Sequence, residues 1–436
     1  MAWPMTLKAI FLHATVVIDG WLVSSLGEAS LAALGIAAAT GGIVLGVVFA
    51  FSHAMQIRTA QSFGSCDPVF MKSVLASGLT VSLTIGVAGV LAILLVGKPF
   101  LAVFAPDAQI ATLAWSYLMI FAVVIFGESI SQCIVSFLNG CGRSKIPLYG
   151  YCLSVPINVV SSIALIHGYW GLPEFGVAGA AMGSALAILV QALFLTGHVV
   201  RSDGNLRHVQ GWQKTSYAAT LRRHVGFSLP IATTFVSAIL AIHICTLIYA
   251  DLELSAFVAL TLIAPWNMVA GQISMQWAQA TGIHVAQLLG GRADNDVLES
   301  FLKSAWRGAF IAAGVVGLIL LIMGLSVNVL YPDLTQDTRT ILIGFLPVLV
   351  VLQFLRATNA ICGNTLRASG DTIYVMHVFI WSQWLFRVPA TALGVLYFDI
   401  PVFWILSIWL WEEFIKFYPF HHRLWDGAWK QAEVTT

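Results

Sequence analysis

Twelve apolar stretches of span length run along the chain, and they restrict its fold more than any other feature. About 20 apolar residues are enough to cross the hydrocarbon core of a bilayer as a helix. Only 9% of the residues are charged, against about 25% in soluble domains. We therefore expect an all-α integral membrane protein with twelve transmembrane helices. The spans lie near residues 3–24, 30–56, 70–97, 108–138, 147–167, 176–200, 226–250, 256–289, 304–328, 336–366, 373–396 and 401–420.

Lysine and arginine are distributed unevenly between the loops. The loops after even-numbered spans and the C-terminal tail hold fifteen of them, whereas the loops after odd-numbered spans hold only Lys98 and Arg339. Cytoplasmic loops of membrane proteins carry the excess of basic residues, and an even number of spans agrees with both ends lying on one side. The expected location is the cell inner (plasma) membrane, as a multi-pass protein with cytoplasmic N- and C-termini.

The two sets of six spans resemble each other at an offset near 226. Pro4 matches Pro230, and residues 57–64 match residues 283–290 in several positions. Six spans per half give both repeats the same orientation, related by an axis along the membrane normal, and a cleft between two such lobes is the usual place for alternating access. A polar segment separates the halves. The expected domains are an N-terminal six-helix lobe (1–200), a cytoplasmic linker (201–225) and a C-terminal six-helix lobe with a short cytoplasmic tail (226–436).

Asp19 is a lone carboxylate inside the first span. A charge at membrane depth costs at least about 2.5–3.5 kcal/mol on insertion scales, and such groups normally face a wet cavity and take part in moving an ion or proton. Asp19 also lies about 22 Å beyond Pro4 along a helix that rises 1.5 Å per residue. A charge that reaches water near the outer interface is therefore the alternative interpretation.

Four motifs along the chain are specific enough to compare with known families. They are Val17–Gly27 running into Leu31–Gly35, Ile157-Asn158 before Ile166–Gly168, Gly171–Ala181, and Leu366–Thr372. These motifs resemble the multidrug and toxic compound extrusion (MATE) family of cation-coupled efflux transporters, in its bacterial form, over nearly the whole chain. The resemblance implies a V-shaped bundle of two pseudo-symmetric six-helix lobes around a central cleft.

Carried over position by position, the resemblance implies an ion-coupling site around Asp19. Asn158 matches an asparagine beside that carboxylate, and Ser162 stands where some members carry Asp and others Asn. Ser184 falls where a cavity threonine is common. Pro4 occupies the position of a first-helix proline that has been proposed as a hinge.

The C-terminal lobe departs from the pattern. Some members of the family carry a Glu in the seventh span and an Asp in the tenth, where this chain has Ala238 and Arg356. We therefore expect no sodium site of that kind in the C-terminal lobe. Arg356 is instead expected to neutralise charge within the lobe.

The expected mechanism is proton antiport through Asp19. Burial disfavours the charged form of a carboxylate, so Asp19 would take a proton from the outside and release it inward. The hydrogen bonds from Asn158, Ser162 and Ser184 would then differ between the two forms. Protonation removes the charge that a cationic compound prefers, so proton and substrate compete. Sodium is the alternative coupling ion, although it favours about 5–6 oxygen ligands and finds only one formal charge here.

Other polar residues within the spans give weaker hypotheses. Glu128, in the fourth span, is a second proton carrier or a partner for a helix-terminal group. Glu412 and Glu413 are expected to face water or Lys416. One helical face carries three glutamines at i, i+4 and i+7, which either line a substrate cavity or make interhelical contacts. These glutamines are Gln272, Gln276 and Gln279.

The expected function is multidrug efflux of lipophilic or cationic compounds. The 26 Phe and 15 Trp residues suit flat cations through cation–π contacts. A rival in the same broad superfamily is a lipid-linked oligosaccharide flippase, which would need an arginine-lined cavity for pyrophosphate. Apart from Arg307 and Arg339 near the starts of the ninth and tenth spans, only Arg356 and Arg387 are arginines within spans here.

Other classes of function find no support in the sequence. There is no zinc-protease motif, no pair of catalytic aspartates and no phosphate-binding glycine loop, so neither an enzyme nor direct ATP drive is expected. The six cysteines have no metal spacing, and no cofactor or metal is expected. Basic residues form no nucleic-acid patch. We expect a monomer whose partners are its small-molecule substrates and membrane lipid.

Overall fold

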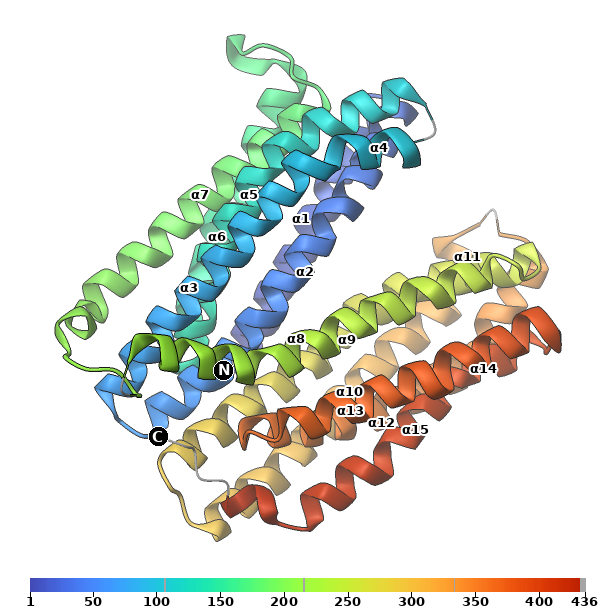
Figure 1. The fold of residues 1–436 in the computed structure, drawn as a ribbon. Coiled ribbons are helices and arrows are strands. Elements are labelled where there is room, and N and C mark those ends of the chain that lie inside the picture. Colours follow the sequence, from blue (N-terminus) through green and yellow to red (C-terminus); the bar gives the residue numbers. More distant parts are fainter. Residues whose placement is uncertain (106, 215, 333, 432–436) are drawn as a thin grey trace. The chain divides into compact units, whose positions relative to one another are not determined.

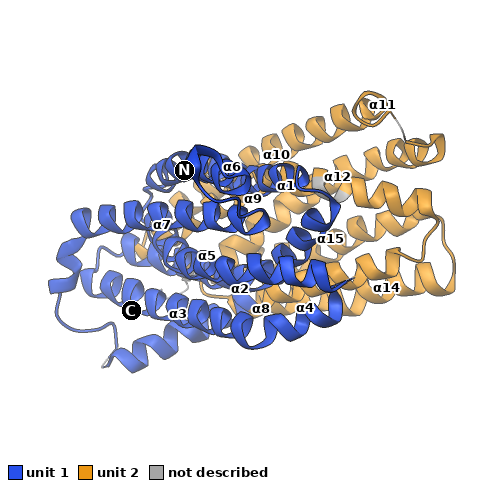
Figure 2. Ribbon diagram, turned by 90° about the horizontal axis from the view of Figure 1, so that it is seen from above, with its two compact units in different colours: residues 1, 3–232 blue, residues 2, 233–436 orange. Residues whose placement is uncertain are grey.

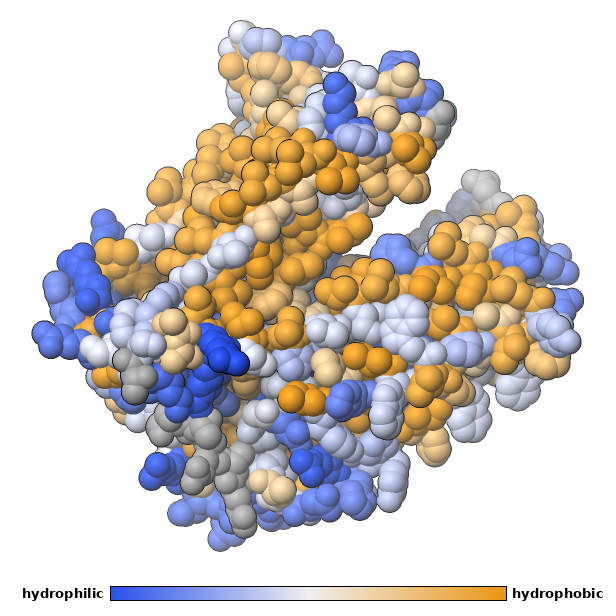
Figure 3. All heavy atoms as spheres, in the orientation of Figure 1, coloured by the Kyte–Doolittle hydropathy of each residue, from blue (hydrophilic) through white to orange (hydrophobic). Residues whose placement is uncertain are grey.

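The computed structural model describes residues 1–436 except 106, 215, 333 and 432–436 (Figure 1). The described residues form α-helices, short π- and 3-10 segments, and no strand. Ten of the helical segments are long and apolar enough to cross a membrane. Apolar residues cover much of the helix flanks of unit 1 that face the viewer, unit 2 shows apolar residues mixed with residues of intermediate hydropathy, and the most hydrophilic residues gather near the helix ends (Figure 3). The predicted all-α, multi-pass membrane fold is confirmed.

Two compact units divide the chain. Unit 1 comprises residue 1 and residues 3–232, and unit 2 comprises residue 2 and residues 233–436 (Figure 2). The boundary falls inside helix α8 (Tyr217–Tyr249). The segment predicted as a linker includes a 3-10 turn, η3 (Gly204–His208), and the start of α8. It is held on unit 1, where the Lys72 ammonium donates to the carbonyl of Val209 at 2.7 Å.

Unit 1 is built around α5, which packs against α2, α3 and α7, while α6 packs against α7. Asp67 and Asp107 cap α3 and α5 by accepting backbone N–H groups of the first turn, which satisfies donors that have no intrahelical partner. The helices of this unit are α1 (Ala2–Ser24), α2 (Glu28–Gly64), α3 (Pro68–Ala92) continued by η1 (Ile93–Gly97) and α4 (Lys98–Phe104), α5 (Ala108–Gly140), α6 (Lys145–His167) and α7 (Val177–Ser202).

Unit 2 is built around α12, which packs against α9, α10 and α15. Its last two predicted spans are helical but do not count among the ten segments. One is divided by π-segments, and the other carries Glu412, Glu413 and Lys416. The remaining helices are α9 (Leu254–Gly290), α10 (Asn295–Leu325), α11 (Val327–Leu330), α12 (Gln336–Ala368), α13 (Thr372–Trp381), η4 (Ser382–Arg387), α14 (Val388–Ala392), η5 (Leu393–Tyr397) and α15 (Val402–Trp425).

Candidate functional site

Asp19 lies in unit 1 on α1, near the C-terminal end of the helix, and only 7% of its surface is exposed. The Ser184 hydroxyl of α7 donates to Asp19 Oδ2 at 3.2 Å. The Asn158 amide of α6 donates in turn to Ser184 Oγ at 3.0 Å. Three of the four predicted ion-coupling residues are therefore joined in one hydrogen-bonded chain across α1, α6 and α7.

Three buried oxygens around this chain have no hydrogen-bond partner among the described residues. They are Asp19 Oδ1, Asn158 Oδ1 and Ser162 Oγ. An unsatisfied buried polar atom costs about 1–3 kcal/mol, and each one in a native structure needs a reason. Ser162 is fully buried on α6, four residues after Asn158, but makes no bond to Asp19. The site thus offers free oxygen acceptors beside one carboxylate, which suits a proton or a hard cation.

Two glycines on α7 allow it to approach α6 closely. A Cβ atom at Gly183 would lie 2.2 Å from Ser162 Oγ and 2.8 Å from the Ser162 backbone nitrogen. A Cβ at Gly179 would lie 2.6 Å from the carbonyl carbon of Leu165. Small residues four apart are typical of close helix–helix contacts in membranes. This role was not predicted from the sequence, although the Gly-x-x-x-Gly spacing of residues 179 and 183 is a signal for it.

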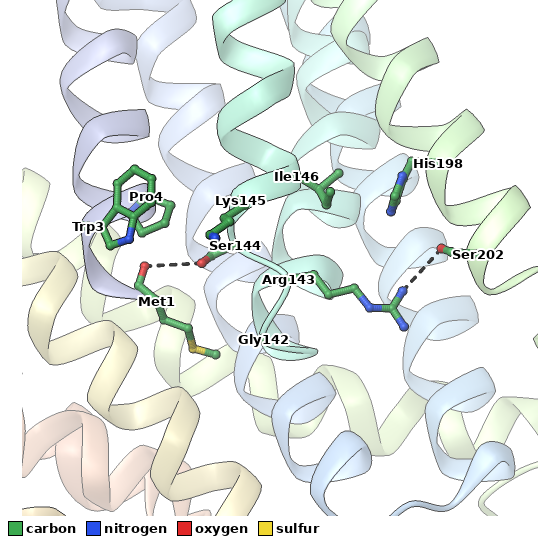
Figure 4. Close-up of a pocket in the computed structure, with 10 residues that line it drawn as sticks. All are labelled: Met1, Trp3, Pro4, Gly142, Arg143, Ser144, Lys145, Ile146, His198 and Ser202. Atoms are coloured by element: carbon green, nitrogen blue, oxygen red, sulfur yellow. Dashed lines mark hydrogen bonds between the residues drawn. The ribbon is translucent and has the colours of Figure 1, made fainter.

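Pro4 lies at the opposite end of α1 from Asp19. The helix begins at Ala2, so Pro4 is in the first turn, where backbone N–H groups have no intrahelical partner. It lines a cavity of about 440 Å³ together with Trp3, residues 142–146, His198 and Ser202 (Figure 4). The hinge role of Pro4 stays a prediction. Its missing N–H removes no hydrogen bond from the helix.

Glu128 is buried in α5 and has a nearby partner. The Gln132 amide, one turn further on, donates to Glu128 Oε2 at 2.8 Å and lies 3.0 Å from the Tyr151 hydroxyl. The Lys8 ammonium lies 5.8 Å from the centre of the Tyr151 ring. Side chains from α1, α5 and α6 therefore form a second polar layer in unit 1. Glu128 is held there by a glutamine, and its role as a proton carrier stays a prediction.

The three glutamines predicted for a substrate cavity lie on α9. The Gln276 amide donates to Gln272 Oε1 at a long 3.4 Å. Gln276 is buried, whereas Gln272 and Gln279 are half-buried. Two of the three side chains thus contact each other along the helix, and their role toward a substrate stays a prediction.

Five charged residues form a cluster inside unit 2, which we call the charge cluster. The Lys416 ammonium lies 3.2 Å from Glu412 and 2.8 Å from Glu413. Glu412 also lies 3.5 Å from Arg387, and Glu413 lies 3.8 Å from Arg356. The two glutamates were predicted to face water or Lys416, and they face Lys416 in a buried setting. The spacing of the two glutamates from Lys416, i+4 and i+3, indicated this contact in the sequence. The contacts with the two arginines were not indicated, because those residues come from η4 and α12.

Among the described residues, no group of three or more His, Cys, Asp or Glu side chains lies close enough to hold a metal ion. The oxygens around Asp19 form no such group either, and they are a candidate for ion binding because three of them lack hydrogen-bond partners among the described residues. They come from one carboxylate, one amide and two hydroxyls.

Comparisons with known proteins agree in family and fold. The MatE family model matches residues 4–164. The probable multidrug resistance protein NorM of Rhizobium meliloti is 24% identical over 373 residues, which are 84% of this chain and 79% of that protein. Its namesake in Thermotoga maritima is 26% identical over 317 residues, covering 70% and 64% of the two chains. A multidrug resistance MATE family transporter of the MOP superfamily, solved in an outward-facing conformation, superposes with a TM-score of 0.86 at 19% identity, over 99% and 95% of the chains.

Proposed function

We propose that this chain is an efflux transporter of the multidrug and toxic compound extrusion family, and that it exchanges lipophilic or cationic compounds for protons at Asp19. The observation that carries this proposal is the incomplete pairing of that carboxylate. One of its oxygens accepts a single hydrogen bond from Ser184, and the other has no partner among the described residues. A buried charge in this condition gains from binding either a proton or a cation.

Competition between these two ligands would couple them. A proton on Asp19 removes the charge, and a cationic compound then loses its attraction to the site. A deprotonated Asp19 attracts the compound and keeps the Ser184 hydroxyl as a donor. Alternating access of the site to the two sides of the membrane would complete the exchange.

Sodium is the second candidate for the coupling ion. The unpartnered oxygens of Asp19, Asn158 and Ser162 are the ligand type that a hard cation takes. They supply one formal charge, and sodium favours about 5–6 oxygens. We therefore place the proton first.

The location, membrane orientation and oligomeric state of the protein are part of the same proposal. We place this multi-pass protein in the cell inner membrane with both termini in the cytoplasm, since the basic loops follow the even-numbered spans. It would act as a monomer in membrane lipid, with no cofactor and without chemical change of its substrate.

The test is reconstitution of the wild type and Asp19→Asn in lipid vesicles under separate proton and sodium gradients. Uptake of rhodamine 123, a lipophilic cation, is the readout. A proton gradient is expected to drive uptake in the wild type only. Asp251→Asn is the matched control, because Asp251 is an exposed residue just after α8, and it should transport like the wild type.

Two results would contradict the proposal. Uptake driven by sodium alone would show that the coupling ion is not a proton. Equal uptake by Asp19→Asn and the wild type under both gradients would remove Asp19 from the coupling mechanism.

A further inference from the structure

The charge cluster of unit 2 holds three cations and two carboxylates, so it carries one surplus positive charge. Glu413 lies 2.8 Å from Lys416, and Glu412 lies 3.5 Å from Arg387. The side chains of Lys416 and Arg387 are 4% and 13% exposed. Arg356 has the longest contact in the cluster, 3.8 Å to Glu413, and the most exposed side chain, at 34%. The surplus charge therefore belongs to Arg356.

The guanidinium of Arg356 is held in place by neutral partners. Its Nη1 donates to Asn267 Oδ1 at 3.0 Å. The Gln353 amide donates to the same oxygen at 3.1 Å, which fixes the orientation of Asn267. A guanidinium has five N–H donors in a planar fork. Within the described part of the chain, Nη1 bonds Asn267 and Nε faces Glu413, whereas Nη2 makes no hydrogen bond, so its two N–H donors are free.

The guanidinium of Arg356 has unpaired N–H donors and lies well inside a span, so it needs a polar environment. A charged side chain facing lipid at this depth is costly, and such groups face a cavity or a partner. The planar fork of arginine matches carboxylate and phosphate groups through two parallel hydrogen bonds. A surplus positive charge in a medium of low dielectric constant also attracts an anion more strongly than it would in water.

We propose that Arg356 binds the anionic group, a carboxylate or phosphate, of lipophilic solutes that this protein carries. Transport of such solutes rests on the proposed function, whereas their binding at Arg356 does not depend on transport. It extends the substrate class from cations to solutes that also bear an oxyanion. An anionic lipid headgroup has the same chemistry, and the experiment separates the two sources.

The test uses the purified full-length protein in a neutral detergent and two dyes. Rhodamine 110 has a free carboxylate, and rhodamine 123 is its methyl ester. Fluorescence anisotropy gives the Kd of each dye. Arg356→Gln is expected to weaken rhodamine 110 binding by about tenfold or more, the size of a lost hydrogen bond to a charged group, and to leave rhodamine 123 nearly unchanged. Arg307→Gln, at an exposed position on α10, is the matched control and should change neither Kd.

Two further variants separate binding from a purely structural role. Glu413→Gln removes a carboxylate and increases the surplus charge, so rhodamine 110 should bind at least as tightly even if the protein unfolds at a lower temperature. A structural role predicts that this variant and Arg356→Gln lose binding together. If Arg356→Gln does not fold, Arg356→Lys replaces it, because lysine keeps the charge but lacks the planar fork. The lysine variant should bind rhodamine 110 more weakly than the wild type does. It should bind rhodamine 123 as tightly as the wild type does.

The inference is overturned if Arg356→Gln weakens both dyes equally, or weakens neither. Nanodiscs of phosphatidylcholine, with and without phosphatidylglycerol, test the lipid source. If phosphatidylglycerol abolishes rhodamine 110 binding to the wild type but does not change binding to Arg356→Gln, the site belongs to a lipid headgroup. That result would overturn the proposal for a solute. Equal binding in both supports it.

The two proposals fail in different ways. Gradient-driven uptake of rhodamine 123 with no Arg356-dependent binding of rhodamine 110 leaves the transport function standing and removes the anion site. Arg356-dependent binding of rhodamine 110, with neither dye driven by any gradient, supports the anion site and removes the transport mechanism.

Discussion

Gly183→Ala is expected to separate α6 from α7 and to disrupt the hydrogen bonds that reach Asp19. The new Cβ would lie 2.2 Å from Ser162 Oγ, 2.8 Å from the Ser162 nitrogen and 3.0 Å from its Cα. The hydroxyl can rotate to another rotamer, but the backbone atoms cannot. The two helices must therefore part by about half an ångström, and overpacking of this kind costs about 1–3 kcal/mol.

The same displacement acts on the candidate site. The Asn158–Ser184 and Ser184–Asp19 hydrogen bonds measure 3.0 and 3.2 Å. About half an ångström more between α6 and α7 brings the Asn158–Ser184 contact to the distance at which a side-chain contact stops counting as a hydrogen bond. The Ser184–Asp19 contact joins α7 to α1, so it lengthens by whatever part of the shift α7 makes. We expect gradient-driven dye uptake to fall by about tenfold, since hydrogen bonds to a charged group contribute about 1.5–3 kcal/mol.

The assays are thermal unfolding of the purified protein and dye uptake into vesicles. Gly197→Ala is the matched control, because it lies on the same helix and its Cβ would meet nothing within 4 Å. That variant should unfold at the wild-type temperature or slightly above it. If both alanine variants unfold and transport alike, the close approach of α6 and α7 does not position Ser184, and this reasoning is wrong.

Three other substitutions test separate parts of the fold. Glu412→Leu leaves Arg387 buried without its carboxylate, and we expect the free energy of unfolding to fall by about 3–5 kcal/mol; a loss below about 1 kcal/mol in denaturant titration contradicts this. Arg143→Ala breaks a 2.6 Å pair with Asp203 at the ends of α5 and α7, and the cost should stay below about 1 kcal/mol and shrink in high salt. Pro4→Ala should change the unfolding free energy by less than about 0.5 kcal/mol, since the first turn loses no hydrogen bond, and dye uptake by this variant decides the hinge prediction.

The spans and the proximity of Asp19, Asn158 and Ser184 could be predicted from the sequence. Span length follows from bilayer thickness, and an apolar run reports it directly. Asp19, Asn158 and Ser184 were placed together by motif matches, and the structure joins them by two hydrogen bonds. Ser162 is near them but bonds to none of them, because a match of position does not fix where a side chain points.

The charge cluster could be predicted only in part. Glu412 and Lys416 are four residues apart on one helix, a spacing at which side chains meet. Their burial depends on Arg387 and Arg356, which come from η4 and α12. A hydropathy profile treats each helix alone and cannot show which helix faces which. The π-segments of the eleventh span could not be predicted from the sequence either, because they change backbone hydrogen bonding without changing composition.

The carboxylates of the charge cluster in unit 2 are paired with cations, whereas Asp19 in unit 1 is not paired with any described cation. This difference decides which of the two sites can exchange an ion. In the charge cluster of unit 2, Glu412 and Glu413 each have a cation within 3.5 Å, and breaking a buried pair costs about 3–5 kcal/mol. Asp19 in unit 1 accepts one hydrogen bond and makes no ion pair with any of the described residues. Asp19→Asn should therefore unfold at the wild-type temperature or above it and lose gradient-driven uptake, whereas Glu412→Gln should unfold earlier and keep its coupling. Thermal unfolding and vesicle uptake of the two variants in parallel test this, and the reverse pattern would place ion exchange in the charge cluster.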